Sequence, residues 1–510
     1  MKRISLFALI AFALALAFAA STSHAQAGGL FGTKAAASPT PTPIPSALPT
    51  ASPEPPSVAI PKLEAKLKAN PNDQQSAAAL AAQFLQVNRP DLAVQLTQRL
   101  LQSGDKTAQV FYYDGYAQQS LGNAQAALFD FENASNLDPT NMGILAQLAE
   151  MYLKANRPSD AERVAKRAVT FNKGEPGALM ELGSVYAAEG HFDDARAQFE
   201  AAYQLNTKDS AAIFQIATTY AQQNNLPMAL QTIDRALAID PKNLQALVYK
   251  ADIYAKQNDE AKAVAAYDDA VVAAPSDDQK VAILVRKAGY FVDAKKNAQA
   301  EAVFQQMVTQ YPKIAGAFVA YGGYYATLKQ FDKAAAQFQA ALAIDPDNAQ
   351  ALLDLGQISL AANKISDGVN FLKHYTQVSP DAQGFALLGQ AYSIAHDYQN
   401  ARDACGKSFE IQRQPETLGC VAGADFELHN YKEAATIFDA LDKNARGYLD
   451  QNPPLLYMAA QSFKSANECT KAVAAYKRLL PMMKKNTPDY TKVQKASTES
   501  CKPAAAPKHS

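Results

Sequence analysis

Apolar and small side chains recur along most of this chain with the spacing of amphipathic helices. In segment 176–205 they first stand at i, i+3, i+4 and i+7, which places them on one face of a helix. These residues are Leu179, Leu182, Gly183 and Tyr186. The polar break EGHFDD follows, and a second apolar stripe then runs through Ala195 and Phe199. The pattern predicts two helices joined by a tight turn, and no alternating strand pattern is found in the chain.

A small residue near the start of each second helix recurs at a nearly constant step. The first five steps are 34 residues each, and the later ones range from 33 to 38. The positions are Ala93, Ala127, Ala161, Ala195, Ala229, Ala263, Ala300, Ala334, Gly368, Ala401, Ala434 and Ala472. A period of this length predicts stacked helix–turn–helix units, because one helix pair cannot bury its own apolar face.

Prolines follow the same period. Pro90, Pro158 and Pro227 each fall where a second helix is expected to begin, the one helical site that tolerates proline. Pro139 and Pro346 follow the expected ends of second helices, where they stop the helix before the next unit.

These residues resemble a tetratricopeptide repeat (TPR) array of the exported bacterial type. The family has small residues at three fixed positions of each unit, aromatic residues at two and a proline near its end. One unit matches with Gly115, Ala127, Phe131, Ala134 and Pro139, and another with Gly322, Tyr325, Ala334, Phe338, Ala341 and Pro346. The family's usual tryptophan is absent, the units near Gly368 and Ala434 match poorly, and 278–281 reads as a short insertion. The resemblance implies an all-α solenoid of about twelve units over residues 74–486, wound as a right-handed superhelix.

The ends of the chain differ from the repeats. Residues 1–27 carry Lys2 and Arg3 before an apolar run and read as a secretory signal peptide, with an uncleaved membrane anchor as the alternative. Residues 28–60 are a linker rich in proline, alanine, serine and threonine, which favours an extended spacer. We therefore expect a periplasmic or secreted protein that contacts a membrane only if the signal peptide remains.

Helical covers are expected at both ends of the array. Residues 61–73 predict a leading helix, and residues 487–502 predict a more polar helix that caps the last unit. Residues 503–510 read as a frayed tail.

Composition and motifs limit the chemistry. The 48 basic and 49 acidic side chains give a net charge of −1, so no nucleic-acid partner is expected. The six histidines are scattered and form no HExxH motif. We predict no catalytic residue, no metal and no cofactor, and an enzyme with a dispersed active site is the least favoured alternative.

All four cysteines lie in the last quarter of the chain. An even number in an exported protein predicts disulfides. Because consecutive helices of a repeat array pack antiparallel, we expect the pairs Cys405–Cys420 and Cys469–Cys501. Buried free thiols are the alternative.

The TPR resemblance implies that first helices line a concave face that holds a segment of a partner protein. The residues at these positions are Tyr112, Tyr116, Met180, Phe214, Val248, Val285, Val319, Leu353 and Tyr457. Replacing Tyr112, Phe214 or Leu353 by alanine is expected to weaken binding with little loss of stability. The alternative is that such residues pack between units.

The expected function is a non-catalytic protein-binding scaffold outside the cytoplasm, in cell-envelope assembly or secretion. The alternative is a glycan-binding accessory of polysaccharide synthesis or export, since glutamine and tyrosine at the same face would also suit a polysaccharide.

Overall fold

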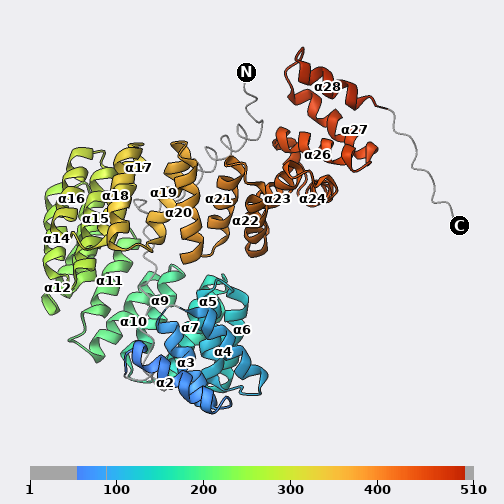
Figure 1. Cartoon of the computed structure of the whole chain (residues 1–510). Coiled ribbons are helices and arrows are strands. Elements are labelled where there is room, and N and C mark those ends of the chain that lie inside the picture. Colours follow the sequence, from blue (N-terminus) through green and yellow to red (C-terminus); the bar gives the residue numbers. More distant parts are fainter. Residues whose placement is uncertain (1–53, 88, 500–510) are drawn as a thin grey trace. The chain divides into compact units, whose positions relative to one another are not determined.

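Each apolar stripe lies on a helix that packs against its neighbours in the chain. The structure is a computed structural model, and it describes residues 54–87 and 89–499. Within these ranges the regular elements are α-helices and one short 3₁₀-helix (Figure 1). The predicted signal peptide, most of the predicted linker and the tail lie outside the described residues.

The chain divides into two compact units, which meet in sequence between Ala274 and Pro275. In the N-terminal unit, α2 (Pro56–Ala69) precedes six helix pairs. The pairs are α3 (Gln74–Gln86) and α4 (Pro90–Gln102), α5 (Ala108–Ser120) and α6 (Ala124–Leu137), α7 (Met142–Lys154) and α8 (Pro158–Phe171), α9 (Pro176–Ala188) and α10 (Phe192–Leu205), α11 (Ser210–Gln222) and α12 (Leu226–Ile239), and α13 (Leu244–Lys256) and α14 (Glu260–Ala273).

The C-terminal unit contains six more pairs in its described part. The pairs are α15 (Asp277–Asp293) and α16 (Asn297–Gln310), α17 (Ala315–Thr327) and α18 (Phe331–Ile344), α19 (Ala349–Ala361) and α20 (Ile365–Val378), α21 (Ala382–Ile394) and α22 (Tyr398–Ile411), α23 (Pro415–Glu427) and α24 (Tyr431–Asn444), and α26 (Pro453–Ser465) and α27 (Cys469–Leu479). α25 (Tyr448–Gln451), η1 (Leu480–Met482) and α28 (Pro488–Ser497) complete it. The all-α fold and the twelve predicted pairs are confirmed.

Within each unit, a helix packs mainly against the helices before and after it. First helices of neighbouring pairs also meet, as α7 does with α9 and α15 with α17. The prolines act as expected: α4 begins at Pro90, α8 begins at Pro158, and Pro227 occupies the first turn of α12.

The core of a pair forms where its two helices cross. A Cβ atom added to Gly183 would lie 2.6 Å from the ring of Phe199, and one added to Gly322 would lie 2.7 Å from the ring of Phe338. Both rings are buried. Glycine is needed here because only a hydrogen at this position lets the ring of the second helix lie against the backbone of the first.

The turn between the two helices of a pair repeats with one geometry. The second residue after the first helix has positive φ in Lys295 (58°) and Lys329 (57°), among others. The next residue donates its N–H to a carbonyl in the last turn, as Gln330 does to Tyr325 at 2.9 Å. This left-handed cap satisfies carbonyls that the helix end leaves free.

The irregular steps of the period have structural causes. The step of 37 before Ala300 reflects α15, which has 17 residues where most first helices have 13. The step of 38 before Ala472 contains the additional helix α25.

The leading helix differs from the sequence expectation. α2 begins at Pro56, inside the stretch assigned to the linker, and ends at Ala69 rather than at residue 73. Pro61 lies within α2 at an exposed position. Because proline has no backbone N–H, the helix lacks one hydrogen bond there, but it continues to Ala69. Ala59 is buried, and α2 packs on α3.

A disulfide joins Cys405 of α22 to Cys420 of α23, with 6.0 Å between their Cα atoms. The first predicted cysteine pair is therefore present, and it links two neighbouring helix pairs. Cys501 lies outside the described residues, so the pairing of Cys469 with Cys501 stays a prediction.

One buried polar contact stands out in the N-terminal unit. Asp114 of α5 and Asp130 of α6 are 3% and 5% exposed, and their carboxyls are hydrogen-bonded to each other. Burial, and then the charge of Asp114, raise the pKa of Asp130 to about 8. The hydroxyl of Thr97 also donates to Asp114. At neutral pH Asp130 therefore keeps its proton.

Replacing Lys329 by glycine is expected to raise the free energy of unfolding by about 1 kcal/mol, since the left-handed conformation costs a residue with a Cβ more than glycine loses in entropy. Lys373→Gly, at an exposed site inside α20, is the control and should lose about 1 kcal/mol. Urea denaturation measures both, and a loss in both variants would contradict the role given to the turn.

The Asp114–Asp130 contact predicts a pH dependence of stability. The folded state keeps a proton that the unfolded chain releases near pH 4, so stability should fall as pH rises from about 4 to about 8, by at most about 1.4 kcal/mol per pH unit. Asp130→Asn keeps a hydrogen-bond donor without the titration, so its stability should fall less over this range. Asp194→Asn, at an exposed site, should follow the parent protein in thermal unfolding at the same pH values.

Candidate functional site

The residues expected to line a binding face all lie on first helices, and they divide by burial. Tyr112 and Leu353 are only 1% and 3% exposed. The other seven are half-buried: Tyr116 on α5, Met180 on α9, Phe214 on α11, Val248 on α13, Val285 on α15, Val319 on α17 and Tyr457 on α26.

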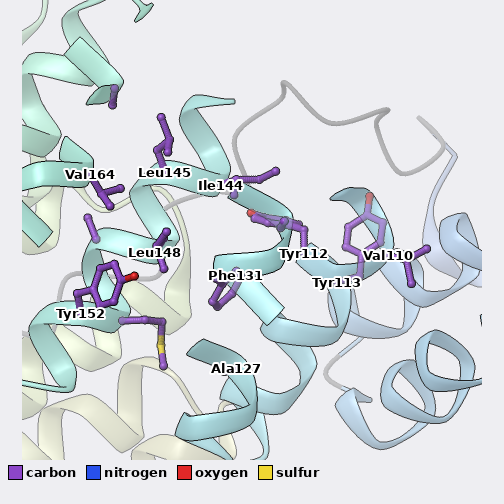
Figure 2. Close-up of a cluster of buried hydrophobic side chains, with 14 of the residues drawn as sticks. Val110, Tyr112, Tyr113, Ala127, Phe131, Ile144, Leu145, Leu148, Tyr152 and Val164 are labelled. Atoms are coloured by element: carbon purple, nitrogen blue, oxygen red, sulfur yellow. The ribbon is translucent and has the colours of Figure 1, made fainter. Parts of the chain in front are cut away.

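Tyr112 is a core residue, which corrects the sequence expectation. Its ring packs edge-on against Phe131 of α6 and Tyr113, at centroid distances of 5.8 Å each, as part of the cluster in Figure 2. Burial raises the pKa of its hydroxyl, which has no hydrogen-bond partner. A ring that other aromatic side chains enclose cannot contact a ligand.

Leu353 requires the same correction. It belongs to a buried cluster with Leu352, Leu372 and Leu387, which come from α19, α20 and α21. Its position in the repeat is shared with Phe214, but the large aliphatic residues around it close over its side chain.

Three of the half-buried residues occupy the same repeat position in consecutive pairs: Met180, Phe214 and Val248. We call them the first-helix strip. Phe214 packs against the apolar clusters on both sides of α11, and its ring meets Tyr249 of α13 edge-on at 5.6 Å. The strip therefore offers partly exposed apolar side chains on helices that the core holds in place.

Acidic groups flank the strip on its N-terminal side. Burial, and then the charge of Glu150, raise the pKa of Glu181 to about 7. Glu150 is itself paired with Lys154 at 2.6 Å. The strip thus lies beside two acidic side chains, one of them with a raised pKa and the other paired with a lysine.

The four described histidines each contact a polar side chain, and His191 does so with Glu189 at 3.3 Å. His374 contacts Asp347 at 2.8 Å, while His396 and His429 each contact a tyrosine two residues later at 2.7 Å. Across residues 54–87 and 89–499, no three histidine, cysteine or acidic side chains converge to hold a metal ion, and no helix is both long and apolar enough to span a membrane.

Two polar pockets were not anticipated from the sequence, and both lie in the N-terminal unit. One, of about 200 Å³, lies between α6, α7 and α8, and the other, of about 260 Å³, lies between α10, α11 and α12. Equivalent lining residues are separated by 68 positions, which is two repeats. They are Glu132 and Glu200, Leu148 and Ile216, Tyr152 and Tyr220, and Arg167 and Arg235. The recurrence of these residue types at an interval of two repeats was the sequence signal that could have indicated the pockets.

Comparisons with known families agree with the helix-pair fold. Two family models match, both described as tetratricopeptide repeat, one at residues 119–179, 186–238 and 325–391 and the other at 214–278 and 285–349. Together they cover a little over half of the 510 residues. No curated protein matches the sequence.

Three solved structures are similar to parts or most of the chain. YrrB, a TPR protein with an unusual peptide-binding site, is 25% identical and covers 36% of this chain and 95% of its own, with a TM-score of 0.30. A thermophilic TPR protein of Thermus thermophilus is 25% identical and covers 35% and 98%, with a TM-score of 0.31. The Cut9–Hcn1 hetero-tetramer of the APC/C is 16% identical and covers 87% and 93%, with a TM-score of 0.32.

The burial of Leu353 predicts that Leu353→Ala lowers the free energy of unfolding by about 2–5 kcal/mol, through lost burial and a residual cavity. Val319→Ala, at the same repeat position of the preceding pair and half-buried, is the control and should lose less. Chemical denaturation compares the two variants. Equal small losses of stability would contradict a core role for Leu353 and favour its assignment to the binding face.

Proposed function

The chain belongs to the tetratricopeptide repeat family, and from this premise we propose that it is a non-catalytic scaffold that binds a segment of a partner protein on the first-helix strip. TPR arrays typically serve as protein-binding scaffolds, and no enzyme family matches the sequence. Fold alone does not name a ligand, so the proposal rests on the residues of the strip.

The observation that carries the proposal is the half-burial of Met180, Phe214 and Val248 in three consecutive pairs. Met180 and Phe214 pack against buried apolar clusters, so their side chains have little conformational entropy left to lose on binding, and all three side chains stay partly accessible. Regularly spaced apolar anchors of this kind suit an extended or helical protein segment.

We propose further that the protein acts outside the cytoplasm, as an exported bacterial TPR protein of cell-envelope assembly or secretion. The sequence of residues 1–27 supports this location, and so does the Cys405–Cys420 disulfide, since such bonds persist in oxidising compartments.

The test uses the full mature chain and peptides selected from a random phage-displayed library. Phe214→Ala should weaken the affinity for selected peptides by at least about tenfold, because a buried aromatic anchor contributes about 2 kcal/mol or more. Fluorescence anisotropy with labelled peptides measures the affinity.

The matched control is Phe129→Ala, which removes a phenylalanine that is 62% exposed on α6, a second helix of the same unit. It should leave the affinity unchanged. Equal losses in the two variants, or no selected peptide at all, would reject the strip as the binding face. A glycan array that yields ligands where the peptide library yields none would favour the polysaccharide alternative.

A further inference from the structure

The pocket between α6, α7 and α8 contains a guanidinium, that of Arg167, which forms no ion pair with the described residues. Arg167 donates from Nη2 to the hydroxyl of Ser135 at 3.1 Å, while its Nε is buried and has no acceptor. No ion pair reaches it from the described residues. A buried N–H of a cation with no acceptor is costly, so this group favours an oxygen ligand.

The neighbouring charges do not supply that oxygen. Arg163, also in the pocket lining, is paired with Asp160 at 3.0 Å. Glu132 accepts from the hydroxyl of Tyr152 at 2.8 Å. Burial, and then the positive charge of Arg163, lower the pKa of Arg167, so its surroundings disfavour the charged form.

The size of the pocket limits what can occupy it. Its volume of about 200 Å³ holds several water molecules at roughly 30 Å³ each, but is below the range of about 300–1,000 Å³ of sites for drug-sized ligands. Leu148, Tyr152 and Val164, which lie near one another in Figure 2, contribute apolar surface to its lining. One small anionic group is the ligand of matching size.

A related pocket recurs two repeats later, with Arg235 at the position of Arg167 but with its second arginine at a different repeat position. The pocket between α10, α11 and α12 again contains two guanidiniums, from Arg196 and Arg235, and one carboxylate, from Glu200. Arg235 is exposed and has no ion pair among the described residues, whereas Arg196 is engaged with Asp193 and with Gln223. Two separate sets of residues thus produce pockets with the same excess of positive charge.

We propose that these two pockets, formed mainly by second helices and separate from the first-helix strip, each bind one oxyanion, a carboxylate or a phosphate group. The α6–α8 pocket is the tighter site, because Arg167 is the more buried of the equivalent arginines. Arginine suits this role because its planar donors match the oxygens of carboxylate and phosphate. A ligand that carries such groups would be held on a different surface from the proposed partner segment.

The experiment titrates the full mature chain with inorganic phosphate and, separately, with acetate, at constant ionic strength maintained with chloride. Isothermal titration calorimetry should show saturable binding of at least one anion. The anion that binds with the higher affinity shows whether the sites prefer a phosphate group or a carboxylate. Arg167→Met keeps most of the side-chain volume and should weaken the affinity of the α6–α8 site by about tenfold or more.

Arg99→Met is the matched control. Arg99 has the same repeat position on α4, 68 residues before Arg167, but it is exposed and lines neither pocket. Its loss should leave anion binding unchanged. Should Arg167→Met fail to fold by circular dichroism, Arg163→Gln, which copies Gln231 of the second pocket, should weaken binding several-fold. Absence of saturable binding to both anions, or equal binding by parent, Arg167→Met and Arg163→Gln, would overturn the proposal.

Discussion

The close crossing of two helices at a small residue is the contact on which the rest of the fold depends. Where Gly183 or Gly322 meets a phenylalanine ring, the second helix lies against the backbone of the first, and no other side chain has room between them. A single pair buries that ring but not the apolar side chains on its outer faces. Each pair must therefore stack on the next. The left-handed turn then sets the angle at which the chain reverses, and its hydrogen bonds make the reversal independent of distant contacts.

Most of the fold was readable from the sequence because its determinants are local. Pro90, Pro158 and the alanine series mark helix starts that need no knowledge of neighbours, and all twelve pairs follow from them. The start of α2 was misplaced because Pro61 was taken as a helix start, although a proline in an exposed helix sacrifices only one hydrogen bond. Left-handed Lys295 and Lys329 were equally hidden, since lysine carries no signal for positive φ.

The binding face was only partly readable, for a physical reason. Repeat position indicates the direction in which a side chain leaves its helix, but its exposure depends on the volumes of residues in adjacent helices. Tyr112 and Leu353 occupy the expected repeat position and are nevertheless covered, by aromatic rings in one case and by leucines in the other. The polar pockets form where side chains from three helices converge, so the signal in the sequence was the recurrence of lining residues such as Arg167 and Arg235 at a two-repeat interval.

The bond between Cys405 and Cys420 has a consequence for how a linear stack comes apart. A terminal helix pair has one neighbour instead of two, so opening starts at the ends and moves inward one boundary at a time. This bond crosses the boundary between the pair α21–α22 and the pair α23–α24. Local unfolding that starts at the C-terminal end can release α26 and α27 and then α24. It stops at α23, because the disulfide holds this helix to α22. While the disulfide is intact, it therefore limits local unfolding from this end to the helices after α23. Reducing the bond would allow the unfolding to extend to earlier helix pairs.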